Sequence, residues 1–162
     1  MTSTNPTPQA LNNHIIAWIR NEIAAQDIRL TSLRELCDSM SRRDPQVVEE
    51  TLARVEKEDE SSRARETKRK AIFEGFGEYW QVNPNVLTLR SIAERMGDTG
   101  ADLMALRLEL AEKVKSVNEA SRMVSATAHM HRAVILDVLN VLFDGNAGDP
   151  LEEQGRLLDA EA

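Results

Sequence analysis

The stretch LMALRLELAEKVKSVNEASRMVSATAHMHRAVILDVLNVLF, residues 103–143, decides the fold. It contains neither proline nor glycine, and its apolar residues return every three or four positions, as they do along one face of an α-helix. The residues of this predicted face are Leu103, Leu106, Leu110, Val114, Val117, Val124, Ile135, Val138 and Leu142. The pattern predicts one long helix that begins near Asp98 or Thr99 and reaches Phe143.

A second pattern of the same kind occupies the chain from about Pro8 to Met40. Apolar residues spaced in this way over such a length are typical of a helical bundle or a coiled-coil seam. Residues 41–44 then read as a turn. The carboxylate of Asp44 suits the N-cap of the next helix, and Pro45 suits its first position, where the missing N–H costs nothing.

The helix that begins at Pro45 changes character along its length. The apolar residues at its start, which share one face, are Val48, Leu52 and Val55. Residues 56–70 then read EKEDESSRARETKRK, with Ala64 as their one apolar residue. A helix that is polar all round packs against little, so we expect this stretch to be helical, largely exposed and in contact with few other side chains. We expect the helix to fray near Gly75 and Gly77.

A short helix, LRSIAERM, follows a connection that contains Asn83-Pro84-Asn85, with Thr88 as its N-cap and Gly97 at its C-terminal end. The predicted fold is all-α: an elongated antiparallel bundle of three long helices with coiled-coil-like packing, plus this short helix. The connections are expected near residues 41–44 and 77–98. The prediction buries Ile19, Ile23, Leu30 and Leu33 against Leu106, Leu110, Val114 and Val117.

The two ends of the chain lack the helical apolar pattern of its middle. Residues 1–8, MTSTNPTP, are polar and contain proline, which predicts a disordered leader before a bundle domain at residues 9–143. Residues 144–162 hold six acidic residues and Arg156, and we expect a flexible acidic tail. The leucines at 151, 157 and 158 give this tail the means to dock or to form a brief helix.

Charge and composition restrict the function classes. The net charge of −7 argues against a protein that mainly binds nucleic acid. The single cysteine, Cys37, cannot form an intramolecular disulfide. The N-terminus lacks a signal-peptide pattern, and no apolar run approaches the roughly 20 residues that span a bilayer. We therefore expect a cytoplasmic protein with no membrane span.

Candidate chemical groups are few. His129 and His131 are two positions apart, so on a regular helix they point to nearly opposite sides and cannot share a metal ion. Cys37 lies on an apolar face, where a small buried hydrophobe is the better interpretation than a nucleophile. The basic residues of 63–70 follow the acids of 56–60 and have no aromatics among them for base stacking. We predict no catalytic residues, no cofactor, no metal and no nucleic-acid binding.

The last long helix also carries apolar residues beside its main face. Because it is apolar on several sides from about Met130 onward, the polar stretch 56–70 cannot cover all of its surface. Such a helix is either buried on several sides or keeps a face for a partner, and methionines allow that face to adapt. With the main face assigned to the core, the side chains predicted to bind a protein partner are Met123, Met130, Val134, Val141 and Phe143.

The order of these segments resembles the FlgN-like family of flagellar type III export chaperones over residues 11–143. The matching parts are a long amphipathic first helix, RDPQVVEETLARVEKE, TLRSIAERMGD, and the C-terminal helical stretch from Leu106 to Gly145. Asn118 matches the first asparagine of the family's central Asn-containing stretch, whereas Ser121 replaces the second. The family's second helix keeps its leucine seam throughout, and residues 56–70 lack it.

The resemblance implies a cytosolic export chaperone without cofactor, which binds the C-terminal helical region of hook–filament junction proteins by helix-in-groove packing. It adds Asn118 to the expected partner-binding residues and makes the export apparatus a further possible partner. One alternative is a structural coiled-coil or adaptor protein that self-associates as a homo-oligomer. A weaker alternative is a nucleic-acid-associated helical protein that uses residues 63–70.

Overall fold

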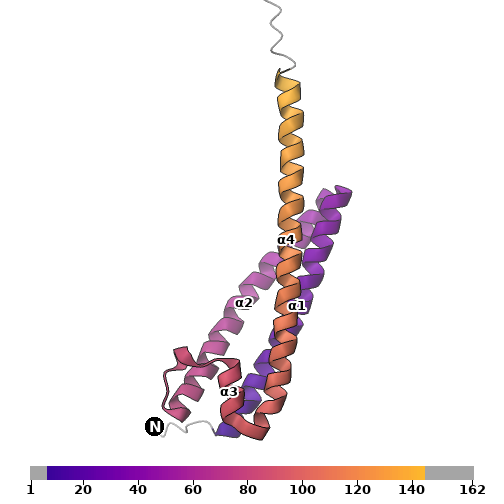
Figure 1. Ribbon diagram of the computed structural model, residues 1–162. Coiled ribbons are helices and arrows are strands. Elements are labelled where there is room, and N and C mark those ends of the chain that lie inside the picture. The colour runs from indigo at the N-terminus through magenta and orange to yellow at the C-terminus, as the bar shows by residue number, and fades with distance from the viewer. Residues whose placement is uncertain (1–6, 145–162) are drawn as a thin grey trace, which may run out of the picture. The chain divides into compact units, whose positions relative to one another are not determined.

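The computed structural model describes residues 7–144, with the side chains of residues 7–142. The helices in this range are α1 (Pro8–Arg42), α2 (Pro45–Trp80), α3 (Leu89–Met96) and α4 (Ala101–Asp144), with short 3₁₀ turns at Pro84–Val86 and Gly97–Gly100 (Figure 1). No strand occurs between residues 7 and 144, so the all-α class is confirmed there. Of the predicted leader and tail, residues 1–6 and 145–162 lie outside the described residues, whereas Pro8 is the first residue of α1 and Asp144 the last residue of α4.

The chain divides into two compact units, residues 1–124 and 125–162, and the boundary falls inside α4. That boundary also falls inside the predicted bundle domain, residues 9–143. The first unit, as far as it is described, contains α1, α2, α3 and the beginning of α4. The second contains the remainder of α4, through Asp144.

The N-terminal ends of the helices form as their capping residues predict. The side chain of Thr7 accepts from the Ala10 N–H at the start of α1. Asp44 Oδ1 accepts from the Val47 N–H at 3.2 Å, and Pro45 is the first residue of α2. Thr88 and Ser91 form a reciprocal capping box at the start of α3. Gly97 follows α3 with a positive φ of 60°.

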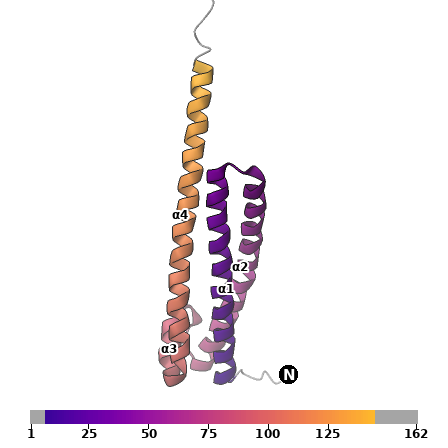
Figure 2. The same cartoon turned by 90° about the vertical axis from the view of Figure 1, so that its right-hand side faces the viewer.

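Helices α1 and α2 lie side by side and antiparallel, joined by a tight turn at Arg43 and Asp44 (Figure 2). Three ion pairs connect them. As the α1 partners move toward the N-terminus of α1, the α2 partners move toward the C-terminus of α2, as in any antiparallel pair. The pairs are Glu35–Arg54 at 2.6 Å, Arg29–Asp59 at 2.8 Å and Glu22–Arg65 at 2.8 Å. Charge pairing therefore replaces an apolar seam over the polar part of α2.

Arg65 contradicts the expectation that residues 56–70 contact few other side chains. Its guanidinium binds both Glu22 and Glu58, and its backbone carbonyl accepts from Trp18 Nε1 at 3.0 Å. Desolvation by burial lowers the pKa of Arg65, but the hydrogen bonds to Glu58 and Glu22 outweigh it and raise that pKa. The stretch is helical and mostly exposed as predicted, yet it is attached to α1 through this residue.

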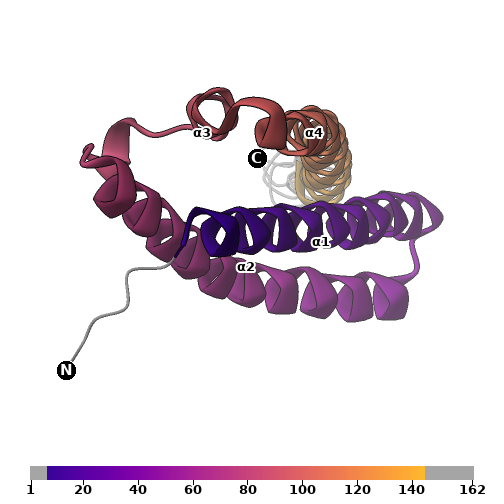
Figure 3. The same cartoon turned by 90° about the horizontal axis from the view of Figure 1, so that it is seen from below.

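The main core of the first unit lies where α1, the end of α2, α3 and the start of α4 meet. In this unit α1 lies between α2 and the first part of α4 (Figure 3). The buried residues of this cluster are Leu11, Ile15, Trp18, Ile19, Ile23, Ile72, Phe73, Phe76, Leu87, Ile92, Ala93, Leu103 and Leu110. A smaller cluster joins Leu33 to Val117 and Ala120 further along the same two helices.

Several predicted burial sites differ in the structure. Ile19, Ile23, Leu33, Leu110 and Val117 are buried as expected, and Leu30 and Leu106 are half-buried. The prediction was wrong for Val114, which is exposed. On α2, Leu52 of the predicted apolar face is exposed, whereas the neighbouring Thr51 is fully buried.

The prediction that α2 frays near Gly75 and Gly77 was also wrong, since the helix continues to Trp80. Both glycines instead lie where another part of the chain comes close to the helix backbone. A Cβ atom on Gly75 would lie 2.9 Å from Leu11 Cδ2, and one on Gly77 would lie 2.9 Å from the Val82 carbonyl oxygen. The glycines therefore serve packing, at a cost in helix propensity that the surrounding contacts offset.

Candidate functional site

The second unit presents a surface rich in large apolar side chains, which we call the α4 apolar surface. Its members are exposed to between 40% and 73%: Met130, Val134, Ile135, Leu136, Val138, Leu139, Val141 and Leu142. The charged residues among 125–142 are Arg132 and Asp137. Soluble proteins rarely leave a large contiguous apolar patch uncovered unless it binds something.

The predicted binding residues Met130, Val134 and Val141 all belong to this surface, and at 3.6 residues per turn they lie on one side of α4. Asn118 and Met123 belong to the first unit, where both are exposed. Helical periodicity separates those two by about 140°, so they do not form one face. The side chain of Phe143 lies outside the described residues.

The prediction that Val124, Ile135, Val138 and Leu142 belong to the core was correct in part. Val124 is half-buried and packs against the cluster of Leu33, Val117 and Ala120. The other three are exposed in the structure and extend the α4 apolar surface by about a quarter of a turn. The sequence assigned these three residues to the core because they continue the apolar repeat of the first part of α4.

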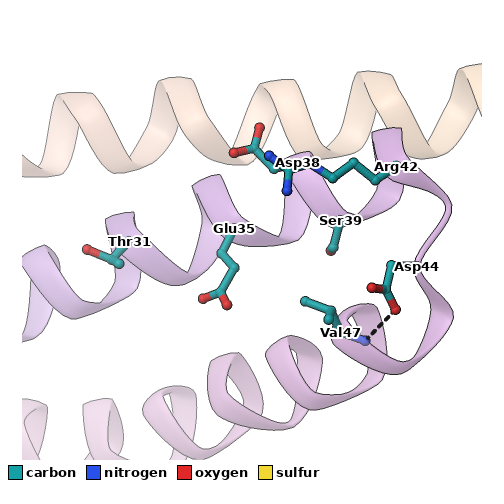
Figure 4. A pocket seen from close by; sticks show the side chains of 7 residues that line it. All are labelled: Thr31, Glu35, Asp38, Ser39, Arg42, Asp44 and Val47. Carbon is teal, nitrogen blue, oxygen red and sulfur yellow. Dashed lines mark hydrogen bonds between the residues drawn. The ribbon is translucent and has the colours of Figure 1, made fainter.

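A second candidate is the pocket between the end of α1 and the start of α2, of about 420 Å³, which the sequence did not indicate (Figure 4). Several of its polar side chains have structural partners. Asp44 caps α2, Glu35 binds Arg54, and the Ser39 hydroxyl donates to the Leu36 carbonyl. Part of the hydrogen-bonding capacity of the pocket is therefore used by the helices that form it.

The remaining candidate residues are dispersed. His14 and His129 are exposed and His131 is half-buried, and among residues 7–144 no group of three or more potential ligands lies together to hold a metal. Cys37 is half-buried. Of the basic residues in 63–70, Arg65 binds Glu22 and Glu58, and Arg69 binds Glu66. No helix in the described part of the chain is both long enough and apolar enough to span a membrane.

Comparisons with protein-family models, with curated proteins and with solved structures found no match for this chain. Candidate functions therefore depend on the α4 apolar surface and on the sequence pattern.

Proposed function

We propose that this protein is a cytoplasmic helical binding protein of the export-chaperone class, which holds the amphipathic helix of another protein on the α4 apolar surface. One observation carries the proposal: every large aliphatic or methionine side chain from Met130 to Leu142 is exposed. Binding an amphipathic helix would remove this apolar area from water at a gain of roughly 25 cal/mol for each Å².

The composition of the surface favours a protein partner over a charged polymer. Arg132 and Asp137 cancel in charge, and the apolar members include Met130, whose flexible side chain adapts to irregular partners. The resemblance to FlgN-like chaperones suggests the partner: the C-terminal helical region of hook–filament junction proteins, covered until export. The predicted antiparallel, coiled-coil-like bundle of three long helices is part of the same proposal.

The test is a binding titration of the full-length protein with a fluorescent peptide from the C-terminal helical region of a hook–filament junction protein. The variant carries Met130→Asp and Val134→Asp. Two carboxylates in the contact would have to lose their hydration without a counter-charge, so we expect binding to be abolished. Circular dichroism should show unchanged helicity, because both side chains are exposed.

Leu108→Asp is the matched control, because Leu108 is also on α4 and is 57% exposed, against 59% for Met130. We expect this variant to bind the peptide as the unsubstituted protein does. Equal affinity of all three proteins would remove the α4 apolar surface from the proposal. No binding by the unsubstituted protein would remove this partner class.

The self-associating adaptor is the second candidate, because the same exposed surface would fit a copy of itself. Sedimentation equilibrium distinguishes the two functions. A monomer at tens of micromolar that binds the peptide supports the chaperone. A dimer that Met130→Asp and Val134→Asp dissociate supports the adaptor instead.

A further inference from the structure

The middle of the α1–α2 hairpin is held together by exposed charges, whereas α2 is fixed by buried contacts on either side of it. We propose that residues 52–64 of α2 form an electrostatic clasp on α1, which opens locally when the ionic strength rises and closes when it falls. Thr51 and Arg65 are the two fixed points between which the clasp moves. The clasp belongs to the first compact unit, and its opening does not involve the α4 apolar surface.

The two ends of the clasp are fixed by different contacts. Thr51, directly before it, is fully buried. At the other end, the Arg65 guanidinium binds Glu22 and Glu58, whose side chains are each 15% exposed. The backbone carbonyl of Arg65 also accepts from Trp18 Nε1 at 3.0 Å. Beyond Arg65, the C-terminal part of α2 belongs to the main core. A local opening of the clasp is therefore limited on both sides.

Between these ends, α2 and α1 have little apolar surface to bury against each other. None of residues 52–64 is buried, and Val55 is the one apolar side chain among them that is half-buried. Trp18 contacts α2 at Arg65, and the buried residues that continue its side of α1 at seven-residue spacing are small: Ala25, Ser32 and Ser39. Leu36 is also buried, but it belongs to neither apolar cluster. Hydrophobic stabilisation of the clasp is therefore small, because it scales with the apolar area removed from water.

Two solvent-exposed ion pairs connect the clasp to α1. In the pair of Glu35 and Arg54, at 2.6 Å, the side chains are 43% and 53% exposed. In the pair of Arg29 and Asp59, at 2.8 Å, they are 30% and 56% exposed. The Nε atom of Arg29 is buried without a hydrogen-bond partner, and its desolvation offsets part of what that pair contributes. A cavity of about 470 Å³, lined by both helices, adjoins Arg54, so the helices pack incompletely here.

Ionic strength therefore acts on the clasp more than on the rest of the hairpin. Raising the salt concentration from about 0.1 M to about 1 M shortens the Debye length from about 10 Å to about 3 Å. Exposed ion pairs weaken under such screening, whereas the buried apolar contacts of the main core carry no charge to screen. When the clasp opens, water reaches the side of α1 that carries Ala25 and Ser32. Salt thus controls access to a surface of α1 that α2 otherwise covers.

Hydrogen–deuterium exchange with mass spectrometry on the full-length protein tests this, at about 0.1 M and about 1 M sodium chloride. A short helix without tertiary contacts is marginal in water, so opening of the clasp appears as faster amide exchange in residues 52–64. We expect exchange there to accelerate about three- to tenfold, the range that weakening two exposed ion pairs allows. Residues 103–120 of α4, whose buried face is apolar, should change much less. Salt-independent exchange in residues 52–64, or equal acceleration in both segments, would overturn the proposal.

A charge-free clasp isolates the two ion pairs. This variant carries Arg29→Gln, Glu35→Gln, Arg54→Gln and Asp59→Asn, which removes both pairs and leaves the net charge unchanged. We expect residues 52–64 of this variant to exchange fast at about 0.1 M salt already and to respond little to further salt. Circular dichroism checks that the variant is folded, and the salt comparison on the unsubstituted protein decides the question if it is not.

The matched control removes the same number of charges of each sign from exposed positions outside the two pairs: Arg34→Gln, Glu56→Gln, Glu60→Gln and Arg63→Gln. It should keep the slow exchange at low salt and the full response to high salt. If the control loses the salt response and the charge-free clasp keeps it, the response comes from charges along α2 itself, and the clasp is wrong.

Discussion

Helix α4 carries the same apolar repeat in both compact units, but the repeat is mostly buried or half-buried in the first and exposed in the second. Leu103 and Val117, two repeats of seven apart, are 0% and 6% exposed, whereas Val138, three repeats beyond Val117, is 52% exposed. In the first unit, α1 and α3 supply side chains that pack on this face. Periodicity therefore identifies the apolar face of a helix. Whether that face is buried depends on the residues of other helices that pack against it.

The largest effect should come from comparing two leucines of α4. Leu103→Ala should lower the free energy of unfolding by about 2–5 kcal/mol, because it leaves a cavity in the main core. Leu142→Ala should change it by less than about 0.5 kcal/mol, as surface substitutions do. Urea unfolding followed by circular dichroism measures both. A Leu142→Ala loss close to that of Leu103→Ala would show that the repeat is buried in both units in solution.

The next effect concerns the turn between α3 and α4, where the two helices come close together. Gly100 is buried at the end of the 3₁₀ turn that precedes α4, and a Cβ atom there would collide with the backbone carbonyl of Ala93 in α3. Gly100→Ala should therefore destabilise the protein by about 1–3 kcal/mol, as overpacking usually does. Gly75→Ala is the comparison, because its Cβ would meet only the flexible end of Leu11.

We expect Gly75→Ala to be close to neutral in the same urea experiment, because the gain in helix propensity, about 0.5–1 kcal/mol, opposes the contact with Leu11. If Gly100→Ala is as well tolerated as Gly75→Ala, then α3 and α4 do not approach each other as closely as the structure indicates.

Residues 56–70 allow a further comparison of buried and exposed positions, because the stretch is polar and yet Arg65 within it contacts α1. Arg65→Ala leaves Glu22 and Glu58 half-buried beside each other without their counter-charge, and should cost about 1–2 kcal/mol. Arg63, two residues away and exposed, is the control, and Arg63→Ala should cost less than about 0.5 kcal/mol. Equal midpoints of thermal unfolding for the two variants would mean that the Arg65 ion pairs contribute nothing.

The sequence predicted where the helices begin better than it predicted which residues of other helices pack against them. Helix starts depend on local chemistry, so the caps at Asp44 and Thr88 were correct. Burial depends on what approaches from elsewhere in the chain. Thr51 is fully buried while the adjacent Leu52 is exposed, a difference that hydrophobicity alone assigns the wrong way round. The contacts of Arg65 with α1 and of Gly100 with α3 likewise require knowledge of the packed structure.

The candidate site was predictable to the same extent. Met130, Val134 and Val141 could be named because the helix has more apolar surface than one neighbour can cover. Ile135 and Val138 could not, because the continuation of the repeat suggested a buried core. The sequence of an apolar repeat is the same whether or not another helix packs against it, so the sequence alone does not show where the packing ends.

The smallest effect belongs to Glu66, a half-buried residue of the same polar stretch. A hydrogen bond from Arg69 lowers the pKa of the Glu66 carboxyl group below its ordinary value of 4.5, although desolvation opposes the shift. Since the folded protein favours the charged form, the pair stabilises it above pH 4.5, and this contribution is lost as the pH falls through the lowered pKa. The side chain is 44% exposed, so solvent screening limits the contribution to less than about 0.5 kcal/mol. Urea midpoints of the unsubstituted protein and Glu66→Gln should therefore differ slightly at pH 7, and the difference should shrink as the pH falls through the lowered pKa. A difference that stays constant as the pH falls would have to come from something other than the charge of Glu66, because protonation removes that charge in the unsubstituted protein.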